Sequence, residues 1–382
     1  MKKLAFDYID AHRDEMIALW QDLVMQESFF DDKEDIDKVG VRLKQEFEAA
    51  GGTVNMCEYE QAGNMLVGTL GAERNNEPVV FMGHMDTVCK KGTIATRPFA
   101  IKDGVAYGPG VLDMKGGNVI ALYVMKALSA AGYNKRPFKW LLAGDEENAH
   151  PHSDAANVFI EQAKGAVAAF NMETGFVNNN IVVGRKGVIR FVLEIKGVSA
   201  HVGNDPENGR SAILEMAHKI IDIEKLTDFE VGTTYNVGTI SGGTVANAVP
   251  DYCKVLIDIR HKSVSDREQI TKCLQAIADK TYVPGTTTTL IPSTTFAPME
   301  TTEGVMQVFN LVKETSIEEG FGIPSPITTG GASDSAYSVI AGVPTLCSMG
   351  VKGGRNHSPE EFAVVETMFE RAKLLIACIL KL

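Results

Sequence analysis

The chain has 382 residues, of which 45% are hydrophobic and 23% are charged, so it is neither disordered nor fibrous and is long enough for two domains. Its net charge of −12 argues against nucleic acid as the main partner, because binding to phosphates needs a basic face. The sequence has no apolar run long enough to span a membrane, so no membrane partner is expected.

The N-terminus carries two lysines that are followed by Asp7 before any apolar segment forms, a pattern that does not resemble a signal peptide. The six cysteines include no C-x-x-C pair and are expected to be reduced and mostly buried. We therefore expect a cytoplasmic protein.

The first fifty residues place apolar side chains at helical spacing (from Met16 to Phe47), which predicts two amphipathic helices. A buried helix is then expected at 119–128. Short apolar strands are expected at four places: 78–82, 138–143, 166–170 and 344–349. Strands that alternate with helices predict an α/β sheet whose strands are largely parallel.

Residues 182–296 follow a different pattern, in which partly alternating strands are separated by helical stretches. The expected strands are 188–195, 253–260 and an exposed or edge strand at 286–291, and the expected helices are 210–225 and 265–280. Two helices on one antiparallel sheet form a compact unit. We predict a parallel-rich catalytic domain from residues 1–181 and 297–382, interrupted by a smaller two-layer α/β domain at 182–296.

Polar side chains follow the ends of several predicted strands. They are His84 and Asp86, then Asp145, Glu146 and Glu147, then Glu173, and finally His357; Asp113 lies in a turn-rich segment before the buried helix. Because ligands bind at the carboxyl ends of the strands in an open α/β sheet, we expect these residues to share one edge.

So many carboxylates cannot stay ionised side by side without a cation, since each raises the pKa of its neighbours. Nitrogen and oxygen donors without a thiolate suit Zn²⁺ and also Co²⁺ or Mn²⁺. Two metal ions about 3.5–4 Å apart need a bridging carboxylate, and we predict Asp113 for that role.

His84 and Asp86 are two residues apart, so in an extended segment they point to the same side, and Asp86 can accept the second ring N–H of His84. Glu146 and Glu147 are adjacent and would point different ways in an extended segment, so that one ligates while the other acts as a general base. His150 and His152 are alternative ligands, but a solvent-exposed loop is the expectation for both.

These motifs resemble the co-catalytic di-zinc exopeptidases and deacylases, a family that includes glutamate carboxypeptidase, acetylornithine deacetylase, succinyl-diaminopimelate desuccinylase, aminoacylase and tripeptidase. The resemblance covers essentially the whole chain. The matching segments are Gly83–Val88, Gly108–Gly117, Gly144–Glu147, Met172–Glu173, Ser199–His201, Gly242–Gly243, Asn247–Pro250, Asp258–Arg260, Gly330–Asp334 and Asn356–Ser358.

The resemblance implies two Zn²⁺ per subunit, with Co²⁺ or Mn²⁺ as alternatives. It places His84 and Glu173 on one zinc, Glu147 and His357 on the other, and Asp113 as the bridge. It also implies that Glu146 is the general base and that Asp86 orients His84.

On the substrate side, the resemblance implies that four elements hold the substrate carboxylate or the developing oxyanion: His201, Asn247, Arg260 and the Gly330–Gly331 turn. It further implies that the inserted domain is a lid that forms a homodimer. In the family the histidine that matches His201 reaches into the active site of the neighbouring subunit.

The implied reaction is hydrolysis of an amide bond in a small peptide or an N-acyl amino acid, and the glutamate carboxypeptidase branch is the most similar. The alternatives are an N-acyl amino acid deacylase of the acetylornithine or succinyl-diaminopimelate type, and a di- or tripeptidase. A non-catalytic binding protein would need the loss of a ligand or of the base, and none is missing.

Two segments depart from the branch pattern. Phe296–Pro298 lacks the arginine that usually precedes the proline and binds the terminal carboxylate of the substrate. Asn148–His150 stands where the branch usually has Gly-Ser after the glutamate pair. The first departure bears on specificity for glutamate, and the second on the rim of the site.

Overall fold

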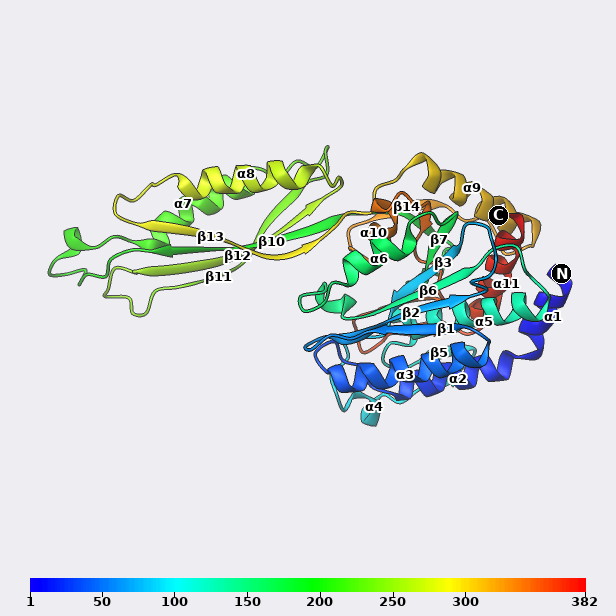
Figure 1. Cartoon of the computed structure of the whole chain (residues 1–382). Helices are drawn as coiled ribbons and strands as arrows, with labels where there is room; N and C mark the ends of the chain where they lie inside the picture. Colours follow the sequence, from blue (N-terminus) through cyan, green and yellow to red (C-terminus); the bar gives the residue numbers. More distant parts are fainter. The chain divides into compact units, whose positions relative to one another are not determined.

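The computed structural model describes residues 1–382, which form two compact units (Figure 1). The first unit consists of Met1–Gly184, Thr301–Thr328 and Ser333–Leu382, and the second of Arg185–Glu300 and Thr329–Ala332. The sequence placed the inserted domain at 182–296, and the second unit also contains the short return segment at 329–332. No helix in the chain is both long and apolar enough to cross a membrane.

The first unit is built on a six-stranded sheet with the order β1-β2-β6-β3-β7-β15. The strands are β1 (Thr53–Cys57), β2 (Gly63–Leu70), β3 (Val79–His84), β6 (Phe138–Gly144), β7 (Ala168–Asn171) and β15 (Thr345–Leu346). Strand β3 runs parallel to β6 and β7, and β15 runs parallel to β7. The predicted parallel-rich α/β class is therefore confirmed, and the antiparallel pair β1 and β2 is added at one side.

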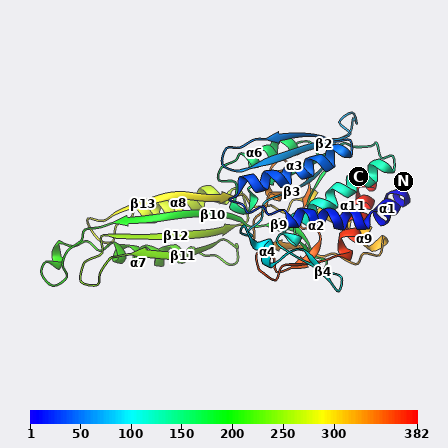
Figure 2. The same cartoon turned by 90° about the horizontal axis from the view of Figure 1, so that it is seen from below.

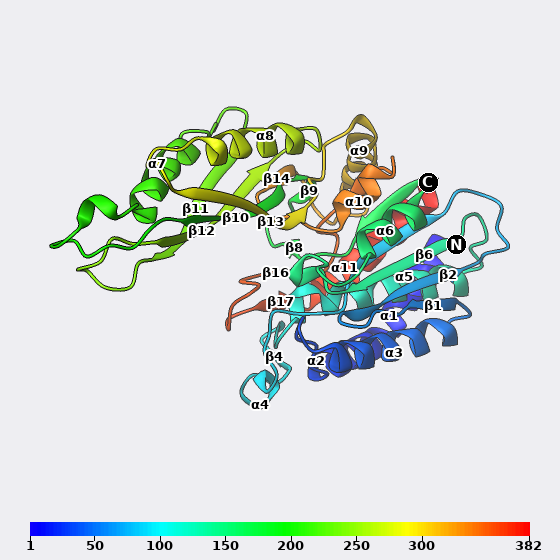
Figure 3. The same cartoon turned by 60° about the vertical axis from the view of Figure 1, so that its left-hand side comes forward.

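Helices cover both faces of this sheet, and Figure 3 shows α3 and α6 on opposite faces. The helices are α1 (Lys2–Ala11), α2 (Arg13–Met25), α3 (Lys33–Ala49), α5 (Gly116–Ala130), α6 (Ala155–Ala163), α9 (Glu303–Glu318), α10 (Ser335–Ile340) and α11 (Glu366–Lys381). The two helices expected from the apolar spacing in the first fifty residues are confirmed as α2 and α3, and α1 is an additional helix that the sequence analysis missed. Helix α1 buries only Ala5 and Ile9, too few positions for a helical stripe.

A second, five-stranded sheet has the order β4-β5-β17-β16-β8. Its strands are β4 (Ala100–Lys102), β5 (Val105–Tyr107), β8 (Gly175–Phe176), β16 (Lys352–Gly354) and β17 (Phe362–Val364), and the one-turn helix α4 (Thr93–Thr96) precedes β4. A further pair joins β9 (Ile181–Arg185) and β14 (Pro326–Thr329). The loop between β16 and β17 carries His357.

The second unit has one antiparallel sheet with the order β11-β12-β10-β13, and β10 and β12 are its long central strands (Figure 2). Helices α7 and α8 lie side by side on one face of this sheet (Figure 1). The elements are β10 (Gly187–Lys196), α7 (Ala212–Glu224), β11 (Thr234–Gly242), β12 (Tyr252–His261), α8 (Asp266–Asp279) and β13 (Thr287–Phe296). Alternate residues of the strands, such as Phe191, Leu193 and Ile257, form an apolar core with the two helices.

Candidate metal centre

The parallel strands deliver the predicted polar residues to one edge of the first sheet. His84 ends β3, Glu146 and Glu147 follow β6, and Glu173 follows β7. The order β6-β3-β7 makes these three strand ends neighbours. Asp113 joins them from the turn before α5, and His357 joins them from the loop between β16 and β17.

One group of donors consists of His84, Asp113 and Glu173, all of them buried. The Nε2 atom of His84 lies 3.2 Å from Oδ1 of Asp113 and 3.6 Å from Oε1 of Glu173. The Nδ1 atom of His84 lies 3.0 Å from the backbone carbonyl oxygen of Asp86. Because a carbonyl oxygen only accepts, Nδ1 carries the proton, and the lone pair of a neutral imidazole is then on Nε2 and faces the two carboxylates.

The other group consists of Asp113, Glu147 and His357. The Nε2 atom of His357 lies 3.2 Å from Oδ2 of Asp113 and 3.1 Å from Oε2 of Glu147. Asp113 therefore presents Oδ1 to His84 and Oδ2 to His357. One carboxylate is shared by both groups, and each of its oxygens faces a different histidine.

These donors have the chemistry and spacing that a divalent cation needs. Tetrahedral zinc with bonds of about 2.0–2.2 Å to nitrogen and oxygen sets neighbouring donors about 3.3–3.6 Å apart. The four distances from the histidine nitrogens to the carboxylates run from 3.1 to 3.6 Å. In addition, Oε1 of Glu147 is buried without a hydrogen-bond partner. The residues present thus fit cations on both sides of Asp113.

The pKa values of these groups show how strongly the carboxylates compete for positive charge. Burial and the charge of Asp113 raise the pKa of Glu147 to about 7. Burial also raises the pKa of Glu146 well above its ordinary value. The hydrogen bonds to Asp113 and Glu147 raise the pKa of His357 to about 11. A cation between the carboxylates would replace these protons as the source of positive charge.

The glutamate pair lies in a short 3₁₀ turn, Glu146–Asn148, so the expected extended segment is wrong. Asp86 holds this turn through the backbone, since its Oδ1 accepts from the amide of Glu146 (3.2 Å) and its Oδ2 from the amide of Glu147 (2.9 Å). The Oδ1 atom also lies 3.4 Å from Nδ1 of His84. Asp86 therefore contacts both the histidine and the glutamate turn, and its predicted orienting role remains a prediction.

Glu361 is a residue that the sequence did not indicate. Its buried carboxylate accepts hydrogen bonds from the amides of Gly110 (3.0 Å), Leu112 (2.8 Å) and Asp113 (3.0 Å). Burial raises its pKa to about 7 in spite of these three donors. Glu361 thereby fixes the turn that carries Asp113. It lies four residues after His357, but the single sequence contains no signal for a contact with residues 248 positions away.

The position of His150 differs from the one expected from the sequence. It was predicted to lie in an exposed loop, but its side chain is only 4% exposed and lies between Asp145 and Asp334. His152 is exposed as expected. Neither histidine belongs to the two donor groups.

The predicted substrate-binding residues belong to the second unit, and they divide between its two ends. Arg260, at the end of β12, donates from Nη1 to the carbonyl oxygen of Gly330 (3.1 Å). His201 forms an isolated β-bridge with Ala248, and Asn247 accepts from the amide of Val202 (3.2 Å), beyond the start of β12. Because β12 has ten residues, at about 3.3 Å per residue the two ends lie about 30 Å apart. Within one chain, His201 and Asn247 are therefore not brought to Arg260 and Gly330.

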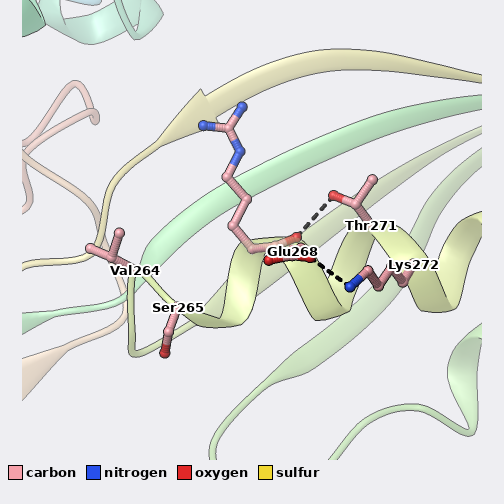
Figure 4. A pocket seen from close by; sticks show the side chains of 6 residues that line it. Val264, Ser265, Glu268, Thr271 and Lys272 are labelled. Atoms are coloured by element: carbon pink, nitrogen blue, oxygen red, sulfur yellow. Dashed lines mark hydrogen bonds and ion pairs between the residues drawn. The ribbon is translucent and has the colours of Figure 1, made fainter.

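A separate surface depression lies at the N-terminus of α8, and Figure 4 shows its side chains. Glu268 accepts from Nζ of Lys272 (2.5 Å), and the hydroxyl of Thr271 donates to the carbonyl oxygen of Arg267 (2.9 Å). These groups partner one another, and the depression contains none of the predicted site residues.

Comparison with known proteins agrees with this geometry. Residues 183–286 match a family model described as the peptidase dimerisation domain. Carboxypeptidase G2 of Pseudomonas sp. is 27% identical over 346 residues, which cover 90% of this chain and 83% of that protein. Succinyl-diaminopimelate desuccinylase of Dechloromonas aromatica is 28% identical over 309 residues, which cover 76% of this chain and 79% of that protein.

Two solved structures share the fold. The aminopeptidase PepT of Bacillus cereus superimposes with a TM-score of 0.81 at 21% identity and covers 96% of this chain and 98% of its own. The M20 family metallo-carboxypeptidase Sso-CP2 of Sulfolobus solfataricus gives a TM-score of 0.76 at 16% identity, with coverage of 96% and 98%.

The chain is thus similar to carboxypeptidase G2 and to succinyl-diaminopimelate desuccinylase along most of its length, and it shares its fold with an M20 family metallo-carboxypeptidase. The resemblance stated from the sequence motifs agrees with these matches, which include carboxypeptidases and a desuccinylase. Sso-CP2 is described as a metallo-carboxypeptidase, and in this chain the two donor groups around Asp113 could each hold a metal ion.

We predict that substitution of Glu146 and substitution of Glu147 have different effects on the enzyme. Glu146→Ala should keep its full metal content and lose about 10²–10⁴-fold in kcat, because a general base is not a ligand. Glu147→Ala should lower the metal content, since Oε2 of Glu147 lies beside His357 in the second donor group. Metal analysis of both purified variants measures this, with wild-type protein as the control. Loss of metal from Glu146→Ala but not from Glu147→Ala would reverse the assignment.

We also predict that removal of metal by a chelator destabilises the protein more at neutral than at acid pH. Glu147 has an ordinary pKa of 4.5 and a folded pKa of about 7, so the metal-depleted protein loses stability as pH rises between these values. The raised pKa of His357 adds a loss that begins above its ordinary value of 6.5. The difference in melting temperature between zinc-loaded and chelated protein should therefore grow from about pH 5 to about pH 7.5. A difference that shrank as pH rose would contradict this account.

Proposed function

We propose that the chain is a zinc-dependent peptidase of the glutamate carboxypeptidase type, which hydrolyses the amide bond of a small peptide or an N-acyl amino acid. The observation that carries the proposal is the shared carboxylate of Asp113, whose two oxygens face His84 and His357. In this proposal His84 and Glu173 hold one zinc ion and Glu147 and His357 hold the other. The similarity to carboxypeptidase G2 along 90% of the chain supports it.

Zinc bound at these donors would supply a Lewis acid and lower the pKa of a water molecule. Glu146 removes the proton from the attacking water and returns it to the leaving amine. Its burial and its raised pKa suit a carboxylate that must hold that proton between the two steps. Asp86 keeps the turn of Glu146 in place through the two backbone amides.

Cationic side chains in the second unit support the recognition of an anionic substrate. Burial and the charges of Lys262 and Arg260 lower the pKa of Lys186. Arg260 is partly neutralised by Asp258, whose Oδ1 lies 2.6 Å from Nε of the guanidinium. The segment Phe296–Pro298 lacks the usual arginine, so recognition of a carboxylate would fall to other cations such as Arg260.

The second candidate is an N-acyl amino acid deacylase, because the same donors and base would serve it. The 28% identity to succinyl-diaminopimelate desuccinylase supports this second candidate. A di- or tripeptidase is the third candidate. The three differ in the groups on either side of the amide bond rather than in the hydrolytic chemistry.

A panel of N-acyl amino acids, dipeptides and tripeptides, tested with zinc-loaded protein, separates these candidates. We predict hydrolysis of substrates with a free C-terminal carboxylate. Their C-terminal amides should be cleaved about ten- to a hundredfold more slowly, which is the usual value of a charge-assisted hydrogen bond. Glu146→Ala is the control for contaminating peptidases. Equal cleavage of the acids and the amides, or no cleavage at all, would contradict the proposal.

We also propose a homodimer in which His201 and Asn247 act in the active site of the partner subunit. The matched dimerisation domain at 183–286 supports it. In addition, β11 is an edge strand on which Ile240 is 59% exposed, and the neighbouring helix α7 exposes Leu214 and Ile221. An unpaired edge beside apolar side chains is typical of an interface. In such a dimer, the end of β12 near His201 and the end near Arg260 would serve different active sites, which accounts for their separation.

Mixing two inactive variants tests the dimer. We predict that His201→Ala costs about 10²–10³ in kcat, the usual loss for one oxyanion donor. Glu146→Ala and His201→Ala, mixed under conditions that exchange subunits, should regain part of the activity, because a mixed dimer contains one site with both Glu146 and a partner's His201. Each variant incubated alone is the control. No activity after demonstrated exchange would show that His201 does not act in trans.

A cytoplasmic location is part of the same proposal. All six cysteines are free in the structure, as expected for thiols in a reducing compartment. The net charge of −12 and the small substrate make a nucleic acid or membrane partner unnecessary for the function.

A further inference from the structure

His150 stands at the point where the loop after the glutamate pair departs from the family pattern. Both Ala149 (φ 61°) and His150 (φ 55°) have left-handed backbone conformations, which residues other than glycine adopt at a cost. The amide of His150 donates to the carbonyl oxygen of Asp145 (3.1 Å), and that of Ala149 to the carbonyl oxygen of Glu146 (2.7 Å). The loop is thus closed tightly and directs the imidazole inward.

The imidazole bridges two buried carboxylates. Its Nδ1 lies 2.8 Å from Oδ1 of Asp145, and its Nε2 lies 2.7 Å from Oδ1 of Asp334. The side chains of these three residues are no more than 4% exposed. Because a carboxylate only accepts, both ring nitrogens donate, which requires the protonated imidazole. Burial opposes that charge, but the two aspartates outweigh it and raise the pKa of His150 well above its ordinary value.

The bridge connects two segments that are distant in the sequence. Asp145 immediately precedes Glu146, and Asp334 immediately precedes α10, which packs against α6. The hydroxyl of Ser153 donates to the same Oδ1 of Asp145 (2.9 Å). The glutamate turn is therefore held from two sides, by Asp86 through its amides and by His150 through Asp145.

We propose that His150 is a positioning residue for the hydrolysis: its imidazole ties Asp145 to Asp334 and so fixes the turn that places Glu146. This inference rests on the proposed role of Glu146 as the general base. A serine at this position would be too short to reach both carboxylates. The bridge therefore depends on the histidine at this position of the loop.

The test compares His150→Gln with the control His152→Gln, which changes the exposed histidine two residues further on. The first readout is hydrogen–deuterium exchange of the peptide that contains the Glu146 and Glu147 amides, which Asp86 protects. We expect at least tenfold faster exchange in His150→Gln and no change in His152→Gln. Unchanged exchange in His150→Gln would overturn the proposal whether or not the enzyme is active.

The second readout is the split between kcat and KM at full metal content. With a misplaced base, kcat should fall about tenfold to a hundredfold, while KM and the bound zinc stay near the wild-type values. A wild-type kcat, or a fall that only follows lost zinc, would overturn the proposal. Wild-type protein without turnover would contradict the proposed function, whereas the exchange result concerns the bridge alone.

A second variant protects the test against failure of His150→Gln to fold. Asp334→Asn retains the imidazole and the shape of its partner but removes the charge. It should show the same direction of change in exchange and kcat, and the double variant His150→Gln/Asp334→Asn should be little worse than either single one, because both remove one bridge. Additive losses would show that the two residues act separately and would overturn the proposal.

Discussion

The candidate metal centre depends on one carboxylate, that of Asp113, whose two oxygen atoms have to face different histidines. The Oδ1 atom of Asp113 lies beside His84, and its Oδ2 atom lies beside His357, 244 positions further along the chain. The three amides that donate to Glu361 hold the turn of Asp113, and the neighbouring strands β3, β6 and β7 bring up the other donors. Because these carboxylates repel one another when ionised, the arrangement is stable only with positive charge between them.

Much of the fold and of the site could be predicted from the sequence, because short apolar strands ending in His84, in the glutamate pair and in Glu173 are local patterns. The rule that parallel strands align their carboxyl ends then predicts one shared edge. In the second unit, the helices expected at 210–225 and 265–280 are confirmed as α7 and α8. Alternation and helical spacing are visible over a window of a dozen residues, so elements of this kind are readable.

Contacts between distant segments could not be predicted. His150 meets Asp334 across 184 positions, and Glu361 meets Asp113 across 248. A single histidine or glutamate in a loop is not part of a hydrophobic periodicity that would indicate its burial. His150 was therefore expected to be exposed. Val41 is an apolar residue that would be expected to be buried, but it is 50% exposed, because it lies two residues from both Val39 and Leu43 and therefore on another face of α3.

In the second unit, the residues predicted to bind the substrate do not all lie at one place. His201 and Asn247 lie beyond the start of β12, and Arg260 lies at its end, so the length of one strand separates them within a chain. The sequence order of the motifs contains no information about this separation. The register of β12 with β10 and β11 places the two ends, and their separation is the reason why a homodimer is proposed.

Anomalous diffraction from crystals of the zinc-loaded protein tests the central claim most directly. Data collected on both sides of the zinc absorption edge should show two peaks about 3.5–4 Å apart, one between His84 and Glu173 and the other between Glu147 and His357, with one oxygen of Asp113 directed at each. A single peak, or two peaks that do not share Asp113, would contradict the account.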